Sequence, residues 1–235
     1  MPSSPRNSIL KRLILVVFIL LPSVGAADEI SPEELERWFQ SDEFGPPRAS
    51  GGPAGETLEF LTPAPDSGLH HHQNIFAIVP RSLSDGWVRL EQCHTNMEST
   101  ARVEIVFRKG RVRDLKVTGS EKIGRAWVEG SSIQLEDVAA GARICLSAWT
   151  RALRINDDGS YTLYSGPYMR RFLDGYFPMH VSADISFAGT GLKFASMTPP
   201  AQPGFEVIRE DERIRYDAWF RGRLVTEINF SPDIL

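Results

Sequence analysis

Hydrophobic and polar residues alternate with a period of two along much of this chain. The clearest runs are residues 103–107, 181–187 and 224–230, in each of which every second side chain is apolar. Successive side chains of a β-strand point to opposite faces, so this period predicts strands with one face in water. Turn residues such as Gly119-Ser120 and Asp157-Asp158-Gly159 separate the runs, which is typical of short strands joined by tight connections.

The spacing of the runs predicts the fold class. About a dozen short runs recur roughly every 8 to 12 residues, and no helical pattern lies between them. We therefore expect residues 57–235 to form one all-β domain, an antiparallel β-sandwich. An open or curled β-barrel is the alternative, because both architectures bury every second residue. Residues 111–117, 125–129, 133–138 and 143–149 are each expected to form a separate strand.

The first 26 residues follow a different pattern. Three basic residues precede nine apolar residues, 13–21, and small residues follow as far as Ala27. This order is that of a secretory signal peptide, and the apolar run is shorter than the roughly 20 residues that cross a bilayer. We expect cleavage near Ala26 or Ala27, a periplasmic or secreted product, and no transmembrane anchor in the mature chain.

Residues 27–56 are expected to form a short helix followed by a linker. Ser31 is suited to cap a helix, Pro32 to occupy its first position, and Glu34 to complete a capping box. The helix is expected to end near Gln40, and its apolar face docks either on its own domain or on a partner. The following residues are rich in Gly and Pro, a composition typical of linkers.

Charge and cysteine content narrow the class of protein. The formal charge of −4 becomes −7 when the three basic residues of the signal peptide are removed, so the mature chain lacks a positive field for nucleic acid. Arginine outnumbers lysine 21 to 5, which indicates a GC-rich bacterial genome. Cys93 and Cys145 are the only cysteines, and in an oxidising compartment they are expected to form one disulfide. Thiols used for metal or redox chemistry are the alternative.

His70-His71-His72 is a candidate metal site. On a strand, His70 and His72 would lie on one face about 7 Å apart, and imidazoles bind copper and zinc. The spacing matches no known metal signature, so a solvated histidine tract is the alternative. No other cofactor is expected.

Residues 161–177 are dense in aromatic and arginine side chains and contain turn residues, which predicts a long loop at one end of the β structure. Tyr and Arg concentrate binding energy at protein surfaces, and loops on a rigid scaffold carry function more often than strands do. The expected binding residues are Tyr164, Tyr168, Arg170, Arg171 and Tyr176. Alternatively, the aromatic rings plug the end of the core and the arginines pair with carboxylates.

The sequence contains no nucleophile elbow, zinc-protease helix or phosphate-binding loop, so no enzyme activity is expected. We expect an exported, noncatalytic binding or interaction module of the cell envelope, whose partner is an envelope protein or another envelope component. A periplasmic carrier of an apolar ligand and a copper- or zinc-binding protein are the alternatives.

Overall fold

The computed structural model describes residues 57–62, 68–172 and 175–233, most of which lie in β-strands. All of them belong to one compact unit, residues 39–235. The predicted signal peptide, N-terminal helix and linker fall in residues 1–56, outside the described residues. Within the described part of the chain, no helix is both long enough and apolar enough to cross a membrane.

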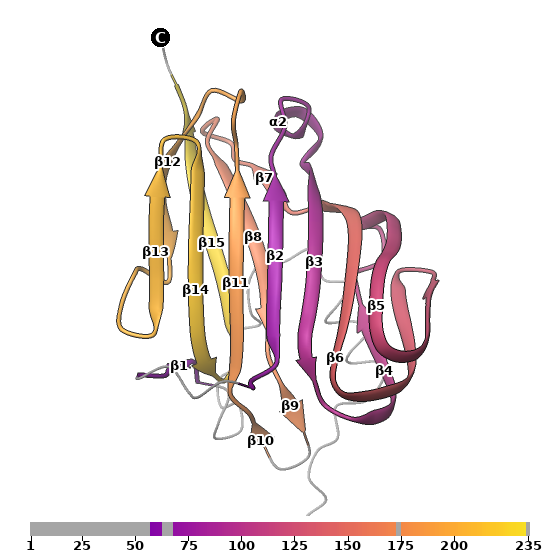
Figure 1. The fold of residues 1–235 in the computed structure, drawn as a ribbon. Helices are drawn as coiled ribbons and strands as arrows, with labels where there is room; N and C mark the ends of the chain where they lie inside the picture. Colours follow the sequence, from indigo (N-terminus) through magenta and orange to yellow (C-terminus); the bar gives the residue numbers. More distant parts are fainter. Residues whose placement is uncertain (1–56, 63–67, 173–174, 234–235) are drawn as a thin grey trace, which may run out of the picture. The chain divides into compact units, whose positions relative to one another are not determined.

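The strands form two main sheets (Figure 1). The larger sheet contains β1 (Glu59–Phe60), β2 (His71–Ala77), β3 (Trp87–Met97), β4 (Thr100–Val106), β5 (Val112–Glu129), β6 (Ser132–Arg151), β11 (Met179–Ser186), β13 (Phe205–Glu210) and β14 (Arg213–Arg221). Its order is β1-β14-β11-β2-β3-β6-β4, with β13 also paired to β14 and β5 also paired to β6. The smaller sheet contains β7 (Leu153–Ile155), β8 (Tyr161–Tyr168), β12 (Leu192–Thr198) and β15 (Leu224–Pro232), in the order β12-β15-β8-β7.

The two sheets pack face to face around one main core. Every second residue of β14, from Ile214 to Phe220, and of β15, from Leu224 to Phe230, is buried, and all of them except Thr226 belong to the same hydrophobic cluster. Aromatic rings meet inside it, with the centroids of Phe187 and Phe230 5.0 Å apart. The predicted all-β sandwich is therefore confirmed, and the sheets do not close into a barrel.

One pair of strands departs from the antiparallel prediction. β2 lies parallel to β11, with His71 opposite His180. Parallel neighbours cannot be joined by a hairpin, and here the chain passes through β3 to β10 between them. The alternating pattern predicts which face a strand buries, but it carries no information on the direction of the neighbouring strand.

Two predicted pairs of strands are in fact single long strands. Residues 111–129 are almost entirely β5 and residues 133–149 lie within β6, because register shifts absorb extra residues without ending the pairing. One of these shifts falls between Val117 and Gly119, so Gly119-Ser120 belongs to an irregular part of the ladder and not to a turn. Apolar side chains of β4, β5 and β6, together with Met97 of β3, form a second hydrophobic cluster.

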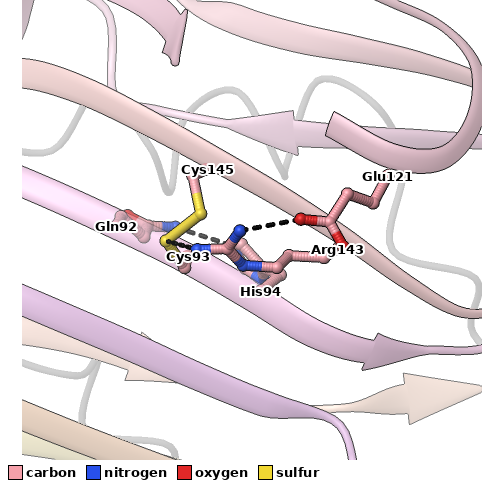
Figure 2. The surroundings of a disulfide bond; sticks show 6 residues. All are labelled: Gln92, Cys93, His94, Glu121, Arg143 and Cys145. Carbon is pink, nitrogen blue, oxygen red and sulfur yellow. Dashed lines mark hydrogen bonds and ion pairs between the residues drawn. A yellow bond between two sulfur atoms is a disulfide. The ribbon is translucent and has the colours of Figure 1, made fainter. Parts of the chain in front are cut away.

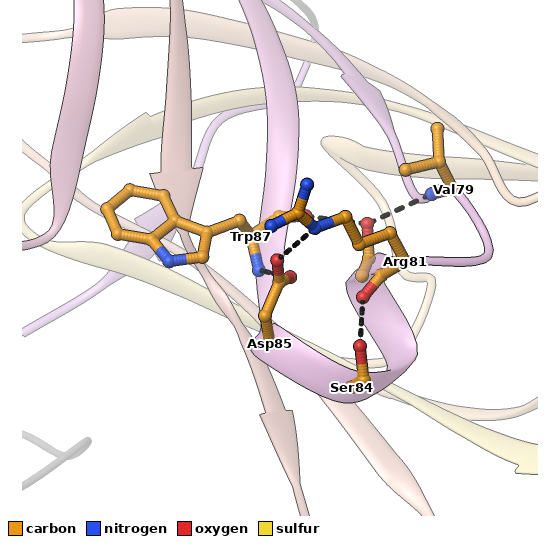
Figure 3. Close-up of polar contacts among 6 residues, drawn as sticks. Val79, Arg81, Ser84, Asp85 and Trp87 are labelled. Atoms are coloured by element: carbon orange, nitrogen blue, oxygen red, sulfur yellow. Dashed lines mark hydrogen bonds and ion pairs between the residues drawn. The ribbon is translucent and has the colours of Figure 1, made fainter.

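A one-turn helix, α2 (Ser82–Asp85), connects β2 to β3 (Figure 3). The backbone N–H of Val79 donates to Ser82 Oγ (3.0 Å), and that of Trp87 donates to Asp85 Oδ1 (3.0 Å). Gly86 ends the helix at φ 74°, and a Cβ there would lie 2.5 Å from the carbonyl oxygen of Leu153, so only glycine fits. These contacts hold the connection that brings β2 and β3 together as antiparallel neighbours.

Candidate functional site

The five histidines of the chain lie on three neighbouring strands or directly before one of them. His70 and His72 share one face, as their spacing predicts, and both rings contact His94 of β3 on the side that faces the core. His71 lies on the opposite face, where it stacks on His180 of β11. We call His70, His72 and His94 the inner cluster.

Hydrogen bonds join the inner cluster to Gln92. The amide Nε2 of Gln92 lies 2.6 Å from Nε2 of His94, and Nδ1 of His94 lies 3.0 Å from Nε2 of His70. Because the amide nitrogen can only donate, His94 Nε2 accepts, which leaves the proton of a neutral imidazole on Nδ1 to be donated to His70. His94 and Gln92 are both buried, so this chain of bonds runs through the interior.

His72 is held in a different way. Its ring meets the Tyr168 ring edge-on, with centroids 4.9 Å apart. Its Nε2 atom is inaccessible to solvent and has no hydrogen-bond partner within the described part of the chain. An unpaired polar atom in such surroundings disfavours any charge on the ring.

Burial keeps the inner cluster neutral. It lowers the pKa of His70 to about 4, with a smaller contribution from Arg170, and it lowers the pKa of His72 to about 3. Burial followed by the neighbouring His72 and His70 holds the pKa of His94 well below its ordinary value. All three imidazoles are therefore uncharged at neutral pH.

Polar side chains continue from the inner cluster into the core. The hydroxyl of Tyr168 is hydrogen-bonded to Ser165, and the hydroxyl of Tyr216 lies 3.3 Å from Thr226 Oγ1. All four residues are buried, and burial raises the pKa of both tyrosines. Tyr168, expected from the sequence to bind a partner, is thus part of the interior of the sandwich.

Arg170 connects the two candidate regions of the sequence. Its side chain, 14% exposed, forms an ion pair with Glu98, which follows β3, and donates to the carbonyl oxygen of Pro178 (3.4 Å). It also lies over the ring of Phe177, 5.5 Å from the centroid. The positive charge of Arg170 also contributes to the lowered pKa of His70, a member of the inner cluster. The histidine tract and the arginine-rich segment, far apart in sequence, therefore meet at one end of the sandwich.

The remaining predicted binding residues lie in two places. Arg171 and Tyr176 are backbone partners in a small separate hairpin of β9 (Arg171–Phe172) and β10 (Gly175–Tyr176). The backbone N–H of Phe177 donates to the carbonyl oxygen of Arg170 (2.9 Å) and closes the base of this hairpin. Tyr164 lies instead on β8 of the smaller sheet, where the Arg154 guanidinium is 5.1 Å from its ring centroid. Residues 161–168 are thus a strand and not part of a loop.

The predicted disulfide is present (Figure 2). Cys93 of β3 and Cys145 of β6 are direct cross-strand partners, with Cα atoms 4.1 Å apart. Cys93 lies between Gln92 and His94, so the bond joins β6 to the strand that carries His94 of the inner cluster. Arg143 reaches across the bond, with its guanidinium 3.9 Å from Cys93 Sγ and 2.9 Å from Glu121 Oε1.

A second polar group occupies the outer face of the larger sheet. His180 Nε2 lies 2.7 Å from Asp217 Oδ1, and His71 Nε2 lies 2.8 Å from Ser182 Oγ. From the sequence, His180 is a further possible metal ligand beside the histidine tract, with the packing of its strand as the alternative, whereas Asp217 is not singled out. Alternation along β14 is enough to place Asp217 on the polar face, but no local signal indicates that β14 pairs with β11.

Comparisons with known proteins identify no family for this chain. No family model and no curated protein matches it. A crystal structure of a mutant M1 zinc metallopeptidase from Deinococcus radiodurans, bound to a Tyr-Ser-Ala substrate, is 10% identical with a TM-score of 0.37, and the match covers 70% of this chain and 42% of that one. A structure of a two-domain M1 zinc metallopeptidase mutant bound to L-tryptophan is 12% identical with a TM-score of 0.35, over 72% and 44% of the two chains. The chain thus spans less than half the length of either protein, and neither likeness bears on its function.

Proposed function

We propose that this protein is exported by a bacterium into the periplasm or the medium, where it acts as a noncatalytic module that binds a protein or another component of the cell envelope. The binding surface is the β9–β10 hairpin together with the adjoining end of the sandwich. The observation that carries the proposal is the fixed base of this hairpin, where the largely buried Arg170 joins Glu98, Phe177 and Pro178.

A fixed base favours recognition because strands that are already paired lose little conformational freedom when they bind. Arg171 and Tyr176, paired across the hairpin, are residue types that concentrate binding energy at protein interfaces.

The packing of the core supports a surface site over a ligand held between the sheets. In the core, the ring of Phe205 contacts the rings of Phe60 and Tyr216, with centroid distances of 5.1 Å and 5.5 Å respectively.

The compartment is supported by the disulfide, since such bonds persist in oxidising surroundings and are rare in the cytosol. Expression of the full chain in a bacterial host is expected to give a mature protein that begins at Ala27 or Asp28 and fractionates with the periplasm or the medium. Intact mass and N-terminal sequencing measure this directly. An unprocessed chain in the cytoplasm would contradict the proposal.

Replacing Arg171 and Tyr176 with Ala is expected to abolish partner capture while changing the melting temperature by only a few degrees, because neither residue belongs to a main sheet. The measurement is crosslinking and pull-down from the envelope fraction of the source organism. The matched control is Arg125→Ala with Trp127→Ala, a cation–aromatic pair on β5 in which Arg125 is exposed and Trp127 is half-buried. Capture that survives the hairpin substitutions, or that is lost equally in the control, would rule out the hairpin as the binding surface.

A further inference from the structure

Three side chains on the outer face of the larger sheet converge from three neighbouring strands. His71 on β2 lies opposite His180 on β11, and Asp217 on β14 lies opposite Ser182, two residues beyond His180. One ring nitrogen from each histidine and one carboxylate oxygen all lie within 4.8 Å of one another. Among the residues that the structure describes, they form the one group of three His, Cys, Asp or Glu side chains with this property.

We propose that His71, His180 and Asp217 bind a divalent transition-metal ion of the zinc and copper class. Two imidazoles and one carboxylate are donors suited to such ions, and three protein ligands leave a further position for water or another ligand. All three side chains are partly exposed, so an ion has access from solvent. The site is independent of the proposed binding hairpin and does not rest on it.

The ligands are held in place before an ion arrives. The His180 ring stacks on two other rings. Its centroid lies 3.6 Å from that of the His71 ring and 4.5 Å from that of the Trp219 ring, and the ring planes in each pair are within 13° of parallel. This stack restricts rotation of both imidazoles, which lowers the entropy lost on binding. The hydrogen bonds of His71 to Ser182 and of His180 to Asp217 are the contacts with which an ion competes.

Charge at the site also suits a cation. The Asp217 carboxylate offsets part of the charge of the ion. The nearest outward carboxylate on β11, Asp184, is already paired with Arg213.

The proposal assigns the middle histidine of the tract, and not the outer two, to the metal. On the inner face, His70 Nε2 is hydrogen-bonded to His94, and His72 Nε2 is enclosed. On the outer face, His71 and His180 are partly exposed, and their strands β2 and β11 run side by side with β14 (Figure 1). The sequence prediction of His70 and His72 stays a prediction, and the same experiment distinguishes the two faces.

The test is to titrate the mature protein, purified without a polyhistidine tag, with Zn²⁺. Binding is measured by calorimetry and by competition with a chromophoric chelator. We expect one ion per chain, and His71→Ala, His180→Ala and Asp217→Asn each to weaken binding at least about 100-fold, since loss of a ligand should exceed the effect of losing an outer-shell partner. Asp184→Asn is the matched control and is expected to bind as the native chain does. Asp217→Asn preserves side-chain shape, so it reports on ligation even if a histidine variant fails to fold.

Trp219 supplies a second measurement. Cu²⁺ bound at this site is expected to quench the fluorescence of Trp219, which stacks on His180, and Trp219→Phe is expected to remove that quenching while the ion still binds. Absence of saturable Zn²⁺ or Cu²⁺ binding overturns the proposal. So does binding that persists in His180→Ala and Asp217→Asn but is lost in His70→Ala with His72→Ala, because the ion would then lie on the inner face.

Discussion

At about pH 5 the protein is expected to be several kcal/mol less stable to unfolding than at about pH 7.5, because the inner cluster is neutral when folded. The pKa values of His70, His72 and His94 lie below the ordinary 6.5 in the folded chain. Below pH 6.5 the unfolded chain binds protons that the folded chain does not, so the free energy of unfolding falls as pH falls. Each of the three contributes up to about 1.4 kcal/mol per pH unit in this range, so that together they contribute up to about 4 kcal/mol per pH unit. His71, whose pKa is also lowered to about 4 but whose side chain is more exposed, adds a smaller contribution of the same sign.

The measurement is urea denaturation at several pH values between about 4.5 and 8 at constant ionic strength. His94→Gln removes one of these groups and is expected to reduce the slope of stability against pH by between roughly one quarter and one third, because the more exposed His71, whose pKa is also lowered to about 4, contributes to the slope as well. The groups around His94 are His70, His72 and Gln92, with the Arg170–Glu98 ion pair beyond His70, and all of these residues are retained in the variant. Ile144→Val, at the position opposite His94, is the control: it is expected to lower stability equally at every pH. An unchanged slope in His94→Gln would show that His94 is not held neutral.

Removing the disulfide is expected to lower the free energy of unfolding by about 4 kcal/mol. The bond closes a loop between positions 52 residues apart and connects two central strands of the larger sheet, so its loss frees the unfolded chain. Cys93→Ala with Cys145→Ala should therefore shift the urea midpoint downward and raise the denaturant slope, because the unfolded state exposes more surface.

Reduction of the native chain provides the matched comparison, since it breaks the same bond without removing either sulfur. Both forms are expected to lose stability by similar amounts. A loss of less than about 1 kcal/mol in both would show that β3 and β6 are held by their hydrogen bonds and packing alone. A loss confined to the double alanine variant would indicate a packing defect near Ile144 and Leu146.

The pattern of apolar residues was enough to predict the strands and the sandwich because a period of two is a local property of the backbone. Val181, Ile185 and Phe230 are buried as the alternation requires. It is not enough to predict where strands end: a bulge tolerates glycine and polar residues as readily as a turn does, so the prediction of a turn at Gly119-Ser120 is wrong and the residues lie within one strand. The cysteine pair was predictable from number and compartment, without knowledge of the pairing of strands.

The candidate site followed the same division. His70 and His72 were predictable as a pair on one face, and Arg170 as a residue of interest. That Arg170 meets the end of β3 depends on its ion pair with Glu98, and that His71, His180 and Asp217 converge depends on β11 lying between β2 and β14.

The sequence by itself determined the class of fold, the buried face of each strand and the disulfide, since these depend on side-chain chemistry and local backbone geometry. Only the tertiary structure decided which strands are neighbours, that β2 and β11 run parallel, and therefore which polar groups meet. The physical reason is that strand pairing is stabilised by backbone hydrogen bonds that nearly every residue can make, so the choice of partner is settled by the packing of the whole core.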